Sequence, residues 1–462
     1  MINHQRHQNH AHQAFHAAIF ILIFIAATTA HALDSVPKPE YRTRRSALAE
    51  RLTNGIAILF AAEEPVLDFM PYRQDEDFYY LTGWNEPGAA LVVIASAPAI
   101  AATDISPARP ARPYREVLFL PTRQLRTEKY TGVKMDAATP AVTSTTGINE
   151  VRPMTEMPAI LNTISTIQRL GPVWIEPKSP QSTALLDFLA ATLSLGTLPE
   201  THNLTDLTTE LRAFKSPAEL ALMKKASDAS IAAQLAEMKA VKPGVTEGKV
   251  AGVIIEKLME EGCERVSYAP IVGSGKNATT LHYAENSATM KSGDLVVIDA
   301  AGEYSMYASD ITRTLPVNGK FTPRQREIYN LVLGAQQAAA TAFVAGKSKI
   351  NDPTHREPDS LDTIAYNYIN AHGKDLHGEP LGKYMIHGIG HLIGIDVHDP
   401  WDYKKPLEKG MAFTIEPGIY LPEENIGVRI EDVVYADEQG KLVDLIAKLP
   451  HTADDIEAAM KK

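Results

Sequence analysis

The sequence predicts an α/β domain over residues 41–200, followed by an α+β domain over residues 204–450 that contains an internal pseudo-two-fold duplication. Strand-like and helix-like segments alternate in the first domain, which favours an α/β arrangement. In the second domain, two helices followed by a β-hairpin occur twice in the same order, and this repetition predicts the duplication. Each hairpin carries two acidic residues within apolar strands, so both halves are expected to contribute to one polar site.

The net charge limits the kinds of partner that the protein can bind. The chain has 462 residues and a formal net charge of −11. A nucleic-acid-binding protein needs a basic excess to neutralise phosphates, so nucleic acid is excluded as the expected partner. The apolar content of 45% is ordinary for a globular protein of two or three domains.

Residues 1–32 are predicted to be a secretory signal peptide. The unbroken apolar run from Ala17 to Ala27 is shorter than the roughly 20 residues that a membrane span needs. Ala30-His31-Ala32 matches an A-x-A cleavage pattern, which predicts cleavage after Ala32. We therefore expect an exported protein, periplasmic or secreted, with no stable membrane association after cleavage; a retained N-terminal anchor is the alternative. Cys263 is the only cysteine, so no internal disulfide can form.

The first domain is predicted from short apolar strands that are separated by helices and turns. Residues 83–88 supply turn material, and residues 96–113 form a loop rich in alanine and proline. The predicted strands are Ala57–Ala61, Phe78–Leu81, Ala89–Ile94, Glu116–Leu120 and Val173–Ile175, and the predicted helices are Tyr41–Leu52 and residues 156–169 and 181–195.

Two capping boxes mark the first helix of each half of the second domain. Ser216-Pro217-Ala218-Glu219 and Thr322-Pro323-Arg324-Gln325 both place a hydroxyl three residues before Glu or Gln, with proline at the first helical position. Each of these helices is followed by a second helix and then by strands. The predicted helices run from residue 217 to about 241, from 246 to about 261, from 323 to about 345 and from 359 to about 372.

The segment LVVIDAAGEYSMYASDITRT, residues 295–314, predicts the first β-hairpin. Its turn is expected at residues 302–305, and folding about that turn places Asp299 opposite Asp310 on one face. Like charges opposite each other in apolar strands are destabilising unless a cation lies between them. The aspartate pair therefore predicts a cation site.

The segment FTIEPGIYLPEENIGVRIEDVV predicts the second hairpin. Glu416 and Glu431 are symmetric about a turn at Glu423-Glu424, so the same argument places both on one face. Between the hairpins lies YMIHGIGHLIGIDVHDP, residues 384–400, whose three glycines weaken a helical prediction and favour irregular backbone. The histidines of this segment are His387, His391 and His398.

The acidic pairs and one histidine form a donor set suited to metal ions. One imidazole with four carboxylates favours Mn²⁺, Fe²⁺ or Co²⁺ over a metal that prefers thiolate. Four carboxylates carry too much charge for one divalent ion, whereas two ions about 3.5–4 Å apart balance it and can hold a bridging hydroxide. Such a site hydrolyses amides. The predicted ligands are Asp299, Asp310, His391, Glu416 and Glu431.

At these residues the chain resembles the metallopeptidases of the pita-bread fold, family M24B. The similar segments are SGDLVVIDAAGEYSMYASDITRTLP, HGIGHLIGIDVHD, GMAFTIEPGIY and GVRIEDVV. The N-terminal segment YRQDEDFYYLTGWNEPGAAL resembles the N-terminal domain of the aminopeptidase P branch. The resemblance covers most of residues 41–450, and all five ligand positions stand in the family's order.

The resemblance implies an Xaa-Pro aminopeptidase with two divalent ions, most often Mn²⁺, with Co²⁺ or Zn²⁺ as alternatives. Asp299 and Asp310 would bind one ion, His391 and Glu416 the second, and Asp310 and Glu431 would bridge both. Glu416 would also carry a proton from the bridging water to the leaving proline nitrogen. His282, His387 and His398 would contact substrate, and Arg429 would orient the ligands. The implied partners are peptides with proline at the second position and further copies of the chain in a dimer or tetramer.

The chain departs from the family pattern at the rim of the site and not at the ligands. Residues 346–380 include the Pro- and charge-rich stretch KSKINDPTHREPDS, and Ala301 replaces a usual glycine. Three alternatives stay open. Prolidase, an Xaa-Pro dipeptidase, is disfavoured because no arginine lies between His391 and Glu416 to bind the dipeptide carboxylate. A non-catalytic peptide-binding protein and a creatinase-like hydrolase without metal are disfavoured because all five ligands are present.

Overall fold

The computed structural model describes residues 34–64, 72–99, 101, 111–168, 171–176, 179–192 and 200–461. The predicted signal peptide, residues 1–32, lies outside the described residues, as does most of the loop predicted at residues 96–113. Within the described part of the chain, no helix is both long and apolar enough to cross a membrane.

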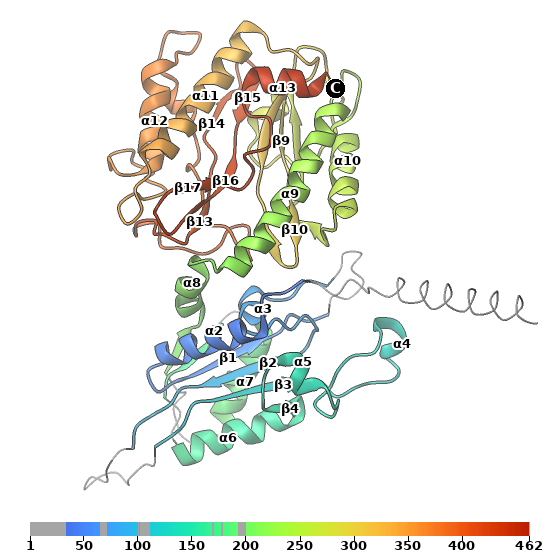
Figure 1. Ribbon diagram of the computed structural model, residues 1–462, viewed down its shortest axis with the longest axis vertical. Helices are drawn as coiled ribbons and strands as arrows, with labels where there is room; N and C mark the ends of the chain where they lie inside the picture. The colour runs from blue at the N-terminus through green and yellow to red at the C-terminus, as the bar shows by residue number, and fades with distance from the viewer. Residues whose placement is uncertain are drawn as a thin grey trace, which may run out of the picture. The chain divides into compact units, whose positions relative to one another are not determined.

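The N-terminal region is a six-stranded mixed sheet with helices on both faces (Figure 1). Side chains of the central strand β1 alternate between two apolar clusters: Leu59 packs on the side of α2, and Ile58 packs on the side of α6 and α7. The strand order is β4 (Val151–Pro153), β3 (Arg115–Leu120), β2 (Ala90–Ile94), β1 (Ile56–Phe60), β5 (Val173–Ile175) and β6 (Thr201–Asn203). The helices are α2 (Lys38–Arg51), α3 (Glu76–Thr82), α4 (Glu128–Thr131), α5 (Val142–Thr146), α6 (Met157–Gln168), α7 (Pro180–Thr192) and α8 (Thr205–Ala213).

The strand predicted at Phe78–Leu81 is wrong, because this segment lies in helix α3. The side chain of Asp75 caps the helix by accepting a hydrogen bond from the Phe78 amide at 2.7 Å. Gly83 ends the helix with a left-handed φ of 64°. A short apolar run fits a strand and a buried helix equally well, and here the two caps decide the outcome.

The C-terminal region consists of two similar halves, and Figure 1 shows their helix pairs on opposite sides of the strands. Both predicted capping boxes are present, at Ser216 and Thr322. The first half contains α9 (Pro217–Ala240), α10 (Glu247–Glu260), β7 (Arg265–Val266), β8 (Ile271–Ser274), β9 (Leu295–Asp299), β10 (Gly302–Tyr304), β11 (Tyr307–Ala308) and β12 (Thr312–Pro316). The second half contains α11 (Pro323–Ala342), α12 (Leu361–His372), β13 (Ala412–Ile415), β14 (Gly418–Leu421), β15 (Ile426–Arg429), β16 (Asp432–Ala436), β17 (Leu442–Asp444) and α13 (Ala453–Met460).

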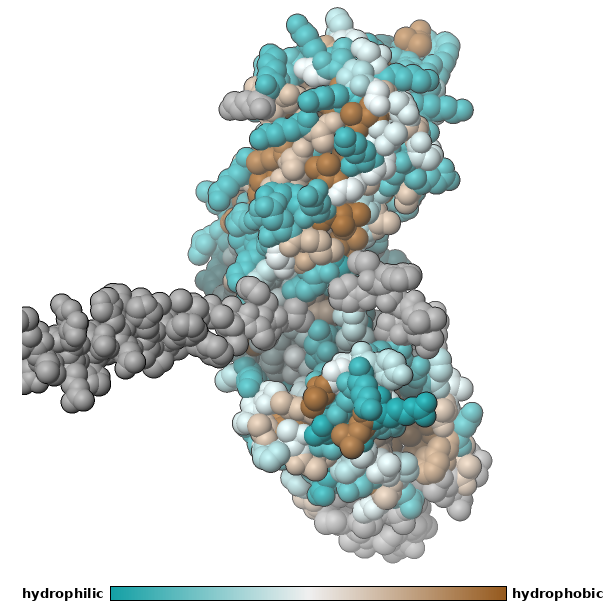
Figure 2. All heavy atoms as spheres, turned by 90° about the vertical axis from the view of Figure 1, so that its right-hand side faces the viewer, coloured by the Kyte–Doolittle hydropathy of each residue, from teal (hydrophilic) through white to brown (hydrophobic). Residues whose placement is uncertain are grey.

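The helix pairs bury one face and expose the other. Helix α10 places Val250, Ile254 and Leu258 in the core at a helical spacing. On the side shown in Figure 2, apolar residues lie scattered among polar ones. The exposed large apolar side chains of α9 and α10 are Leu235, Ile255 and Met259.

A buried glutamine in each half joins the two strands that carry the acidic residues. Gln234 of α9 donates from Nε2 to the carbonyl oxygens of Ala300 and Ile311, both at 3.2 Å. Gln336 of α11 donates in the same way to Ile415 at 2.9 Å and Ile430 at 3.3 Å. Each carbonyl belongs to a residue next to one of the predicted acidic ligands. The two halves thus repeat the contact that fixes those ligands, as the predicted duplication requires.

Replacing Gln336 with leucine is expected to destabilise the fold by about 1–3 kcal/mol, because two buried carbonyl oxygens lose their donor. Urea denaturation followed by circular dichroism measures the change in the free energy of unfolding. The matched control is Gln337→Leu, since Gln337 is the exposed neighbour on the same helix. Equal stability of the two variants would contradict this role for Gln336.

Candidate metal centre

The first hairpin forms, but the register predicted for it is wrong by two residues. Asp299 pairs with Thr312, not with Asp310, and the two-residue turn consists of Ser305 and Met306. Both turn residues have positive φ, 51° and 72°. Gly302, the first of the four residues expected in the turn, lies in β10 instead. A Cβ on it would stand 2.5 Å from Cys263 Sγ, so this glycine allows close packing.

Because the register differs from the predicted one by two residues, an even number, each side chain stays on the predicted face of its strand. Asp299 and Asp310 therefore still lie close together. The hydroxyl of Tyr268 lies 2.5 Å from Asp299 Oδ1 and 2.5 Å from Asp310 Oδ1. Burial and the two aspartates raise the pKa of Tyr268, so it stays a hydroxyl. Its single hydrogen can satisfy only one of the two carboxylates. The pair therefore retains negative charge that a cation can balance.

The second hairpin has the predicted register. Gly418 pairs with Arg429 and Leu421 with Ile426, and this ladder is centred on Glu423-Glu424 as expected. Glu416 lies between β13 and β14, and Glu431 lies between β15 and β16, so both stand at the break between the β13–β16 ladder and the β14–β15 ladder. Their amides donate to Ile389 at 2.7 Å and to Thr312 at 3.1 Å. The second of these bonds joins the two halves directly beside the acidic residues.

The predicted ligands converge in two overlapping groups. Suitable donor atoms of Asp299, Asp310 and Glu431 lie within 4.8 Å of one another, as do those of His391, Glu416 and Glu431. Glu431 is common to both groups, as expected for a residue between two ions. A third such group contains Asp310, His391 and His398. All nine predicted site residues line one cavity of about 600 Å³: His282, Asp299, Asp310, His387, His391, His398, Glu416, Arg429 and Glu431.

The carboxylates are buried against one another. Burial raises the pKa of Glu416 to about 7, and Asp310 adds to the effect. Burial and the neighbouring Asp310 and Glu416 also raise the pKa of Glu431 well above its usual value. Burial opposes the charge on His391, but Asp310 and Glu416 raise its pKa to about 9. These shifts are those of a crowded anionic cluster that binds positive charge.

The orientation of His391 fits a metal ion. Its Nδ1 lies 3.1 Å from the carbonyl oxygen of Leu392, so Nδ1 carries the hydrogen and donates it. Nε2 faces oxygens of Asp310 and Glu416, each 3.4 Å away, and the raised pKa of His391 places a proton on Nε2 when no metal ion is bound. A metal ion that replaces this proton would be bound by the Nε2 lone pair and by the same carboxylate oxygens. This hard donor set, one nitrogen and carboxylate oxygens, fits divalent ions.

Arg429 connects the metal-binding cluster to His387. It donates to Asp299 at 2.6 Å and to the Tyr420 hydroxyl at 2.8 Å. Tyr420 donates to His387 Nε2 at 2.8 Å, and His387 Nδ1 donates to the Gly388 carbonyl at 2.8 Å. Burial and Arg429 lower the pKa of His387 to about 4. His387 is therefore a neutral, oriented imidazole at the rim.

A buried ion network holds the backbone beside His398. Asp399 accepts from Arg212 at 2.6 Å and from Lys215 at 2.8 Å, and it also accepts from the Asp396 amide at 3.1 Å. Arg212 also donates to Asp77 at 2.8 Å. The His398 ring stands edge-on to that of His391, with centroids 4.2 Å apart. His398 and the exposed His282 both face the cavity.

Sequence reasoning missed several residues at this site. Tyr268 lies in a segment without clear periodicity, so nothing in the sequence indicated its contact with the aspartates. The contact of Tyr420 with Arg429 could have been predicted. The predicted register pairs Arg429 with Gly418, and Tyr420 lies two residues after Gly418 on the same face of the strand. Asn351 lines the cavity from the stretch that departs from the family pattern. The irregular backbone predicted for residues 384–400 is confirmed.

Comparison with known proteins gives consistent matches over both regions. The family model of metallopeptidase family M24 matches residues 221–438, and that of the aminopeptidase P N-terminal domain matches residues 41–170. Xaa-Pro aminopeptidase of Escherichia coli (strain K12) is 33% identical over 454 residues, which cover 93% of this chain and 99% of that protein.

Solved structures agree with the sequence matches. E. coli aminopeptidase P with the inhibitor Pro-Leu has a TM-score of 0.79 and 31% identity, over 93% of this chain and 99% of that one. A zinc-substituted form of the E. coli enzyme in complex with product has the same TM-score of 0.79, 31% identity and coverages of 93% and 99%.

Proposed function

The chain belongs to the aminopeptidase P branch of metallopeptidase family M24, and from this premise we propose that it is an Xaa-Pro aminopeptidase with two divalent metal ions. Family membership makes it a metallo-aminopeptidase with an α/β N-terminal domain and a C-terminal pita-bread domain, as predicted. The proposed substrates are peptides with proline at the second position, and the bond cleaved is the one before that proline. We propose that the N-terminal domain spans residues 41–200 and that the catalytic domain spans residues 204–450.

One observation carries this proposal. Two groups of metal-binding side chains share Glu431 in a single cavity, within a chain that matches E. coli Xaa-Pro aminopeptidase over 93% of its length. The segment from His391 to Glu416 supports aminopeptidase over dipeptidase action. In this segment, the cationic side chains that could bind the carboxylate of a dipeptide are lysines, and arginine is absent. One of these lysines, Lys405, is already paired with Glu210 at 2.7 Å.

The donor set indicates which residues would hold the ions. Asp299, Asp310 and Glu431 would hold one ion, and His391 and Glu416 would hold the other together with Asp310 and Glu431. When bound, the ions would lower the pKa of water and polarise the scissile carbonyl. We propose Mn²⁺ as the native ion, with Co²⁺ or Zn²⁺ as alternatives; the zinc-substituted relative shows that such a site accepts zinc in that protein.

The protein's own groups orient the substrate and move the proton. Glu416 would take a proton from the attacking water and give it to the proline nitrogen, which has no hydrogen of its own. Arg429 would hold Asp299 in place through the 2.6 Å contact. His282, His387 and His398 would line the path of the peptide, and their distribution around the cavity supports this role.

The substrate test compares Ala-Pro-Ala, Ala-Pro and Ala-Ala-Ala with the Mn²⁺-loaded protein. We expect release of alanine from Ala-Pro-Ala and little release from the other two peptides. Mass spectrometry of the products identifies the bond that is cut. Exclusive cleavage of Ala-Pro would establish a prolidase instead, and cleavage of none of the three would refute the proposed function.

Asp310→Asn is expected to weaken the binding of both ions, because Asp310 groups with Asp299 and Glu431 and its carboxylate also lies 3.4 Å from His391 Nε2. We expect at least a tenfold loss in metal affinity, the scale of losses seen when a metal site is disturbed. Isothermal titration with Mn²⁺ measures the stoichiometry and both affinities. Asp359→Asn is the control, since Asp359 is an exposed acid paired with Lys347. Two unchanged affinities in Asp310→Asn would contradict the bridging role.

We further propose that the protein is exported and forms a homo-oligomer. The apolar run and A-x-A pattern in residues 1–32 support export, and the family resemblance supports a dimer or tetramer. N-terminal sequencing of the protein from a bacterial host should begin at Leu33, and light scattering should give the mass of two or four chains. An N-terminus at Met1, or a monomer mass, would contradict the respective proposal.

A further inference from the structure

Residues 121–135 form an arm that carries helix α4 and extends away from the N-terminal sheet (Figure 1). Three of its side chains are the most exposed large hydrophobic side chains among the described residues: Tyr130 is 84% exposed, Val133 75% and Leu125 74%. Helix α4 itself has no buried residue. The arm therefore presents its apolar side chains to water instead of packing them against its own chain.

Hydrogen bonds within the arm and at its end fix its shape. Arg123 donates to both carboxylate oxygens of Glu128, at 2.6 Å and 2.8 Å. The amide of Gly132 donates to the Glu128 carbonyl at 3.1 Å and ends α4 with a φ of 79°, which favours glycine. The amide of Met135 donates to Glu86 at 3.3 Å and ties the arm to the loop before β2. The exposure of the apolar side chains is therefore a property of a folded segment.

The composition of the arm is typical of a protein interface. Soluble monomers rarely expose large apolar patches, and larger ones usually mark a binding site. Tyrosine and arginine are enriched at the centres of interfaces, where large side chains exclude water. The arm places Tyr130 and Arg126 in the same short segment as Leu125 and Val133. This combination indicates a surface that another protein covers.

The charge of the arm indicates which protein that is. The cations of the arm are Arg123, Arg126, Lys129 and Lys134, and Glu128 is its only acidic residue. The whole chain nevertheless has a net charge of −11, so the acidic excess lies outside the arm. Complementary charges on two surfaces attract and orient the partners. A second copy of this chain therefore offers the acidic surface that the basic, apolar arm fits.

We propose that the arm, residues 121–135, binds a second copy of the chain, with Leu125, Tyr130 and Val133 at the centre of the interface and the arm's cations at its rim. Most oligomers of identical chains are symmetric, so each copy contributes its own arm. Two arms together supply apolar area toward the roughly 1,200–2,000 Å² that a stable interface buries. The inference names the surface of the homo-oligomer proposed above and does not depend on the peptidase activity.

The first experiment replaces Leu125, Tyr130 and Val133 with serine in one variant of the full chain. Because all three side chains are exposed, thermal unfolding should stay that of the wild type. Analytical ultracentrifugation should show a dissociation constant at least about thirtyfold higher, the loss expected for one residue that dominates an interface. The matched control replaces Val344 and Leu376, which are 53% and 63% exposed outside the arm, with serine and should keep the wild-type mass.

The second experiment places a thiol-reactive photocrosslinker on Lys129→Cys in the arm. Cys263 does not compete for the label, because it is 4% exposed and burial raises its pKa to about 12. Illumination should join two copies covalently, and the yield should fall when the serine substitutions are added.

Unchanged association of the triple-serine variant would overturn the inference and leave the proposed oligomer intact. A monomeric wild type would overturn both, whatever its peptidase activity. A monomeric wild type that binds phosphatidylglycerol vesicles through the arm would assign the arm to a membrane surface instead.

Discussion

Replacing Glu416 with glutamine is expected to lower kcat for Ala-Pro-Ala by about 10²–10⁴-fold, the range for loss of a general acid–base group. The amide keeps the shape of the side chain but cannot take a proton from water and give it to the proline nitrogen. Glu416 is placed for this task, because it lines the cavity and lies 3.4 Å from His391 Nε2. Stopped-time assays with the purified variant measure the loss.

The control must separate proton transfer from loss of metal, since Glu416 is also a predicted ligand. Metal content is therefore determined on the same sample, and activity is expressed per protein that holds two ions. Glu423→Gln is the matched variant, because Glu423 is an exposed acid in the turn of the same hairpin. It should behave as the wild type. Turnover within tenfold of the wild type in Glu416→Gln would remove its role in proton transfer.

Asp399→Asn is expected to destabilise the folded protein by about 3–5 kcal/mol, the cost of leaving buried charges without their partner. Asp399 is 2% exposed and binds both Arg212 and Lys215, which are themselves buried. Asparagine can still form hydrogen bonds but cannot balance two positive charges. Urea denaturation gives the difference in free energy of unfolding.

This difference should depend on pH in a defined direction. Burial alone would raise the pKa of Asp399, but Lys215 and Arg212 lower it below its usual value. A carboxyl whose pKa is lower in the folded protein contributes stability above its unfolded pKa, near 4, and loses it as the pH falls through the folded value. The gap between wild type and Asp399→Asn should therefore be full at neutral pH and shrink in acid.

The control for this prediction is an ion pair at the surface. Glu210→Gln breaks the pair with Lys405, in which both side chains are about half exposed, 49% and 48%. Exposed pairs contribute roughly 0–1 kcal/mol, so this variant should remain close to the wild type. A loss below 1 kcal/mol in Asp399→Asn would mean that Arg212 and Lys215 find other partners.

The two hairpins show what the sequence can and cannot predict. The symmetry of Glu416 and Glu431 about Glu423-Glu424 predicted the correct register, because apolar alternation continued on both sides of the turn. In the first hairpin, the turn was expected at residues 302–305, but it consists of Ser305 and Met306. Gly302 serves close packing against Cys263, while Ser305 and Met306 adopt the left-handed conformation. Tertiary packing thus outweighed the local preference for a turn at Gly302. The prediction that Asp299 and Asp310 share a face still holds, because the register is shifted by an even number of residues.

Contacts that depend on distant segments could not be predicted from the residues alone. Asn351 meets Gly390 across 39 positions, and Tyr268 meets Asp310 across 42. No periodicity links such segments, so only the folded chain brings them together. The strand predicted at Phe78–Leu81 was wrong for a different reason: a short apolar run fits either kind of element, and the cap from Asp75 favours the helix. The candidate metal ligands could be predicted from the sequence, because carboxylates within apolar strands are unusual.

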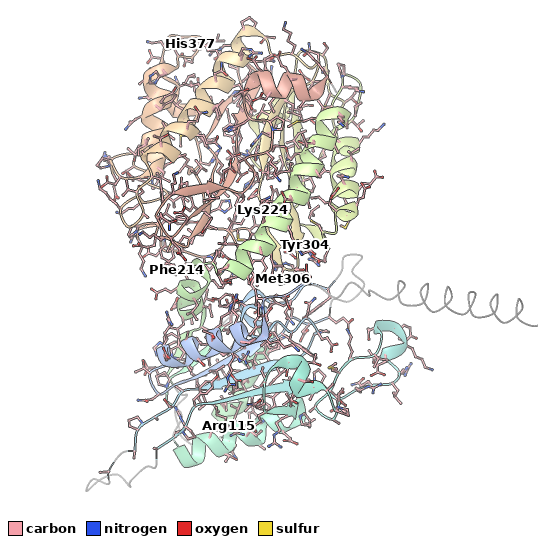
Figure 3. All side chains as sticks on the ribbon, viewed as in Figure 1. Arg115, Phe214, Lys224, Tyr304, Met306 and His377 are labelled. Atoms are coloured by element: carbon pink, nitrogen blue, oxygen red, sulfur yellow. The ribbon has the colours of Figure 1, made fainter. Side chains whose placement is uncertain are left out.

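The tip of the β10–β11 hairpin has a consequence for how this protein can be divided. Figure 3 labels Tyr304 and Met306 at this tip. Met306 and Tyr307 are only 3% and 1% exposed, and they belong to the same apolar cluster as Tyr79 and Leu81 of α3. A chain shortened to begin at residue 204 would open this cluster to water, and an aromatic side chain of this size exposes roughly 150–250 Å². Exposed apolar surface favours self-association, so the N-terminal region serves as a cover that keeps the hairpin tip out of water.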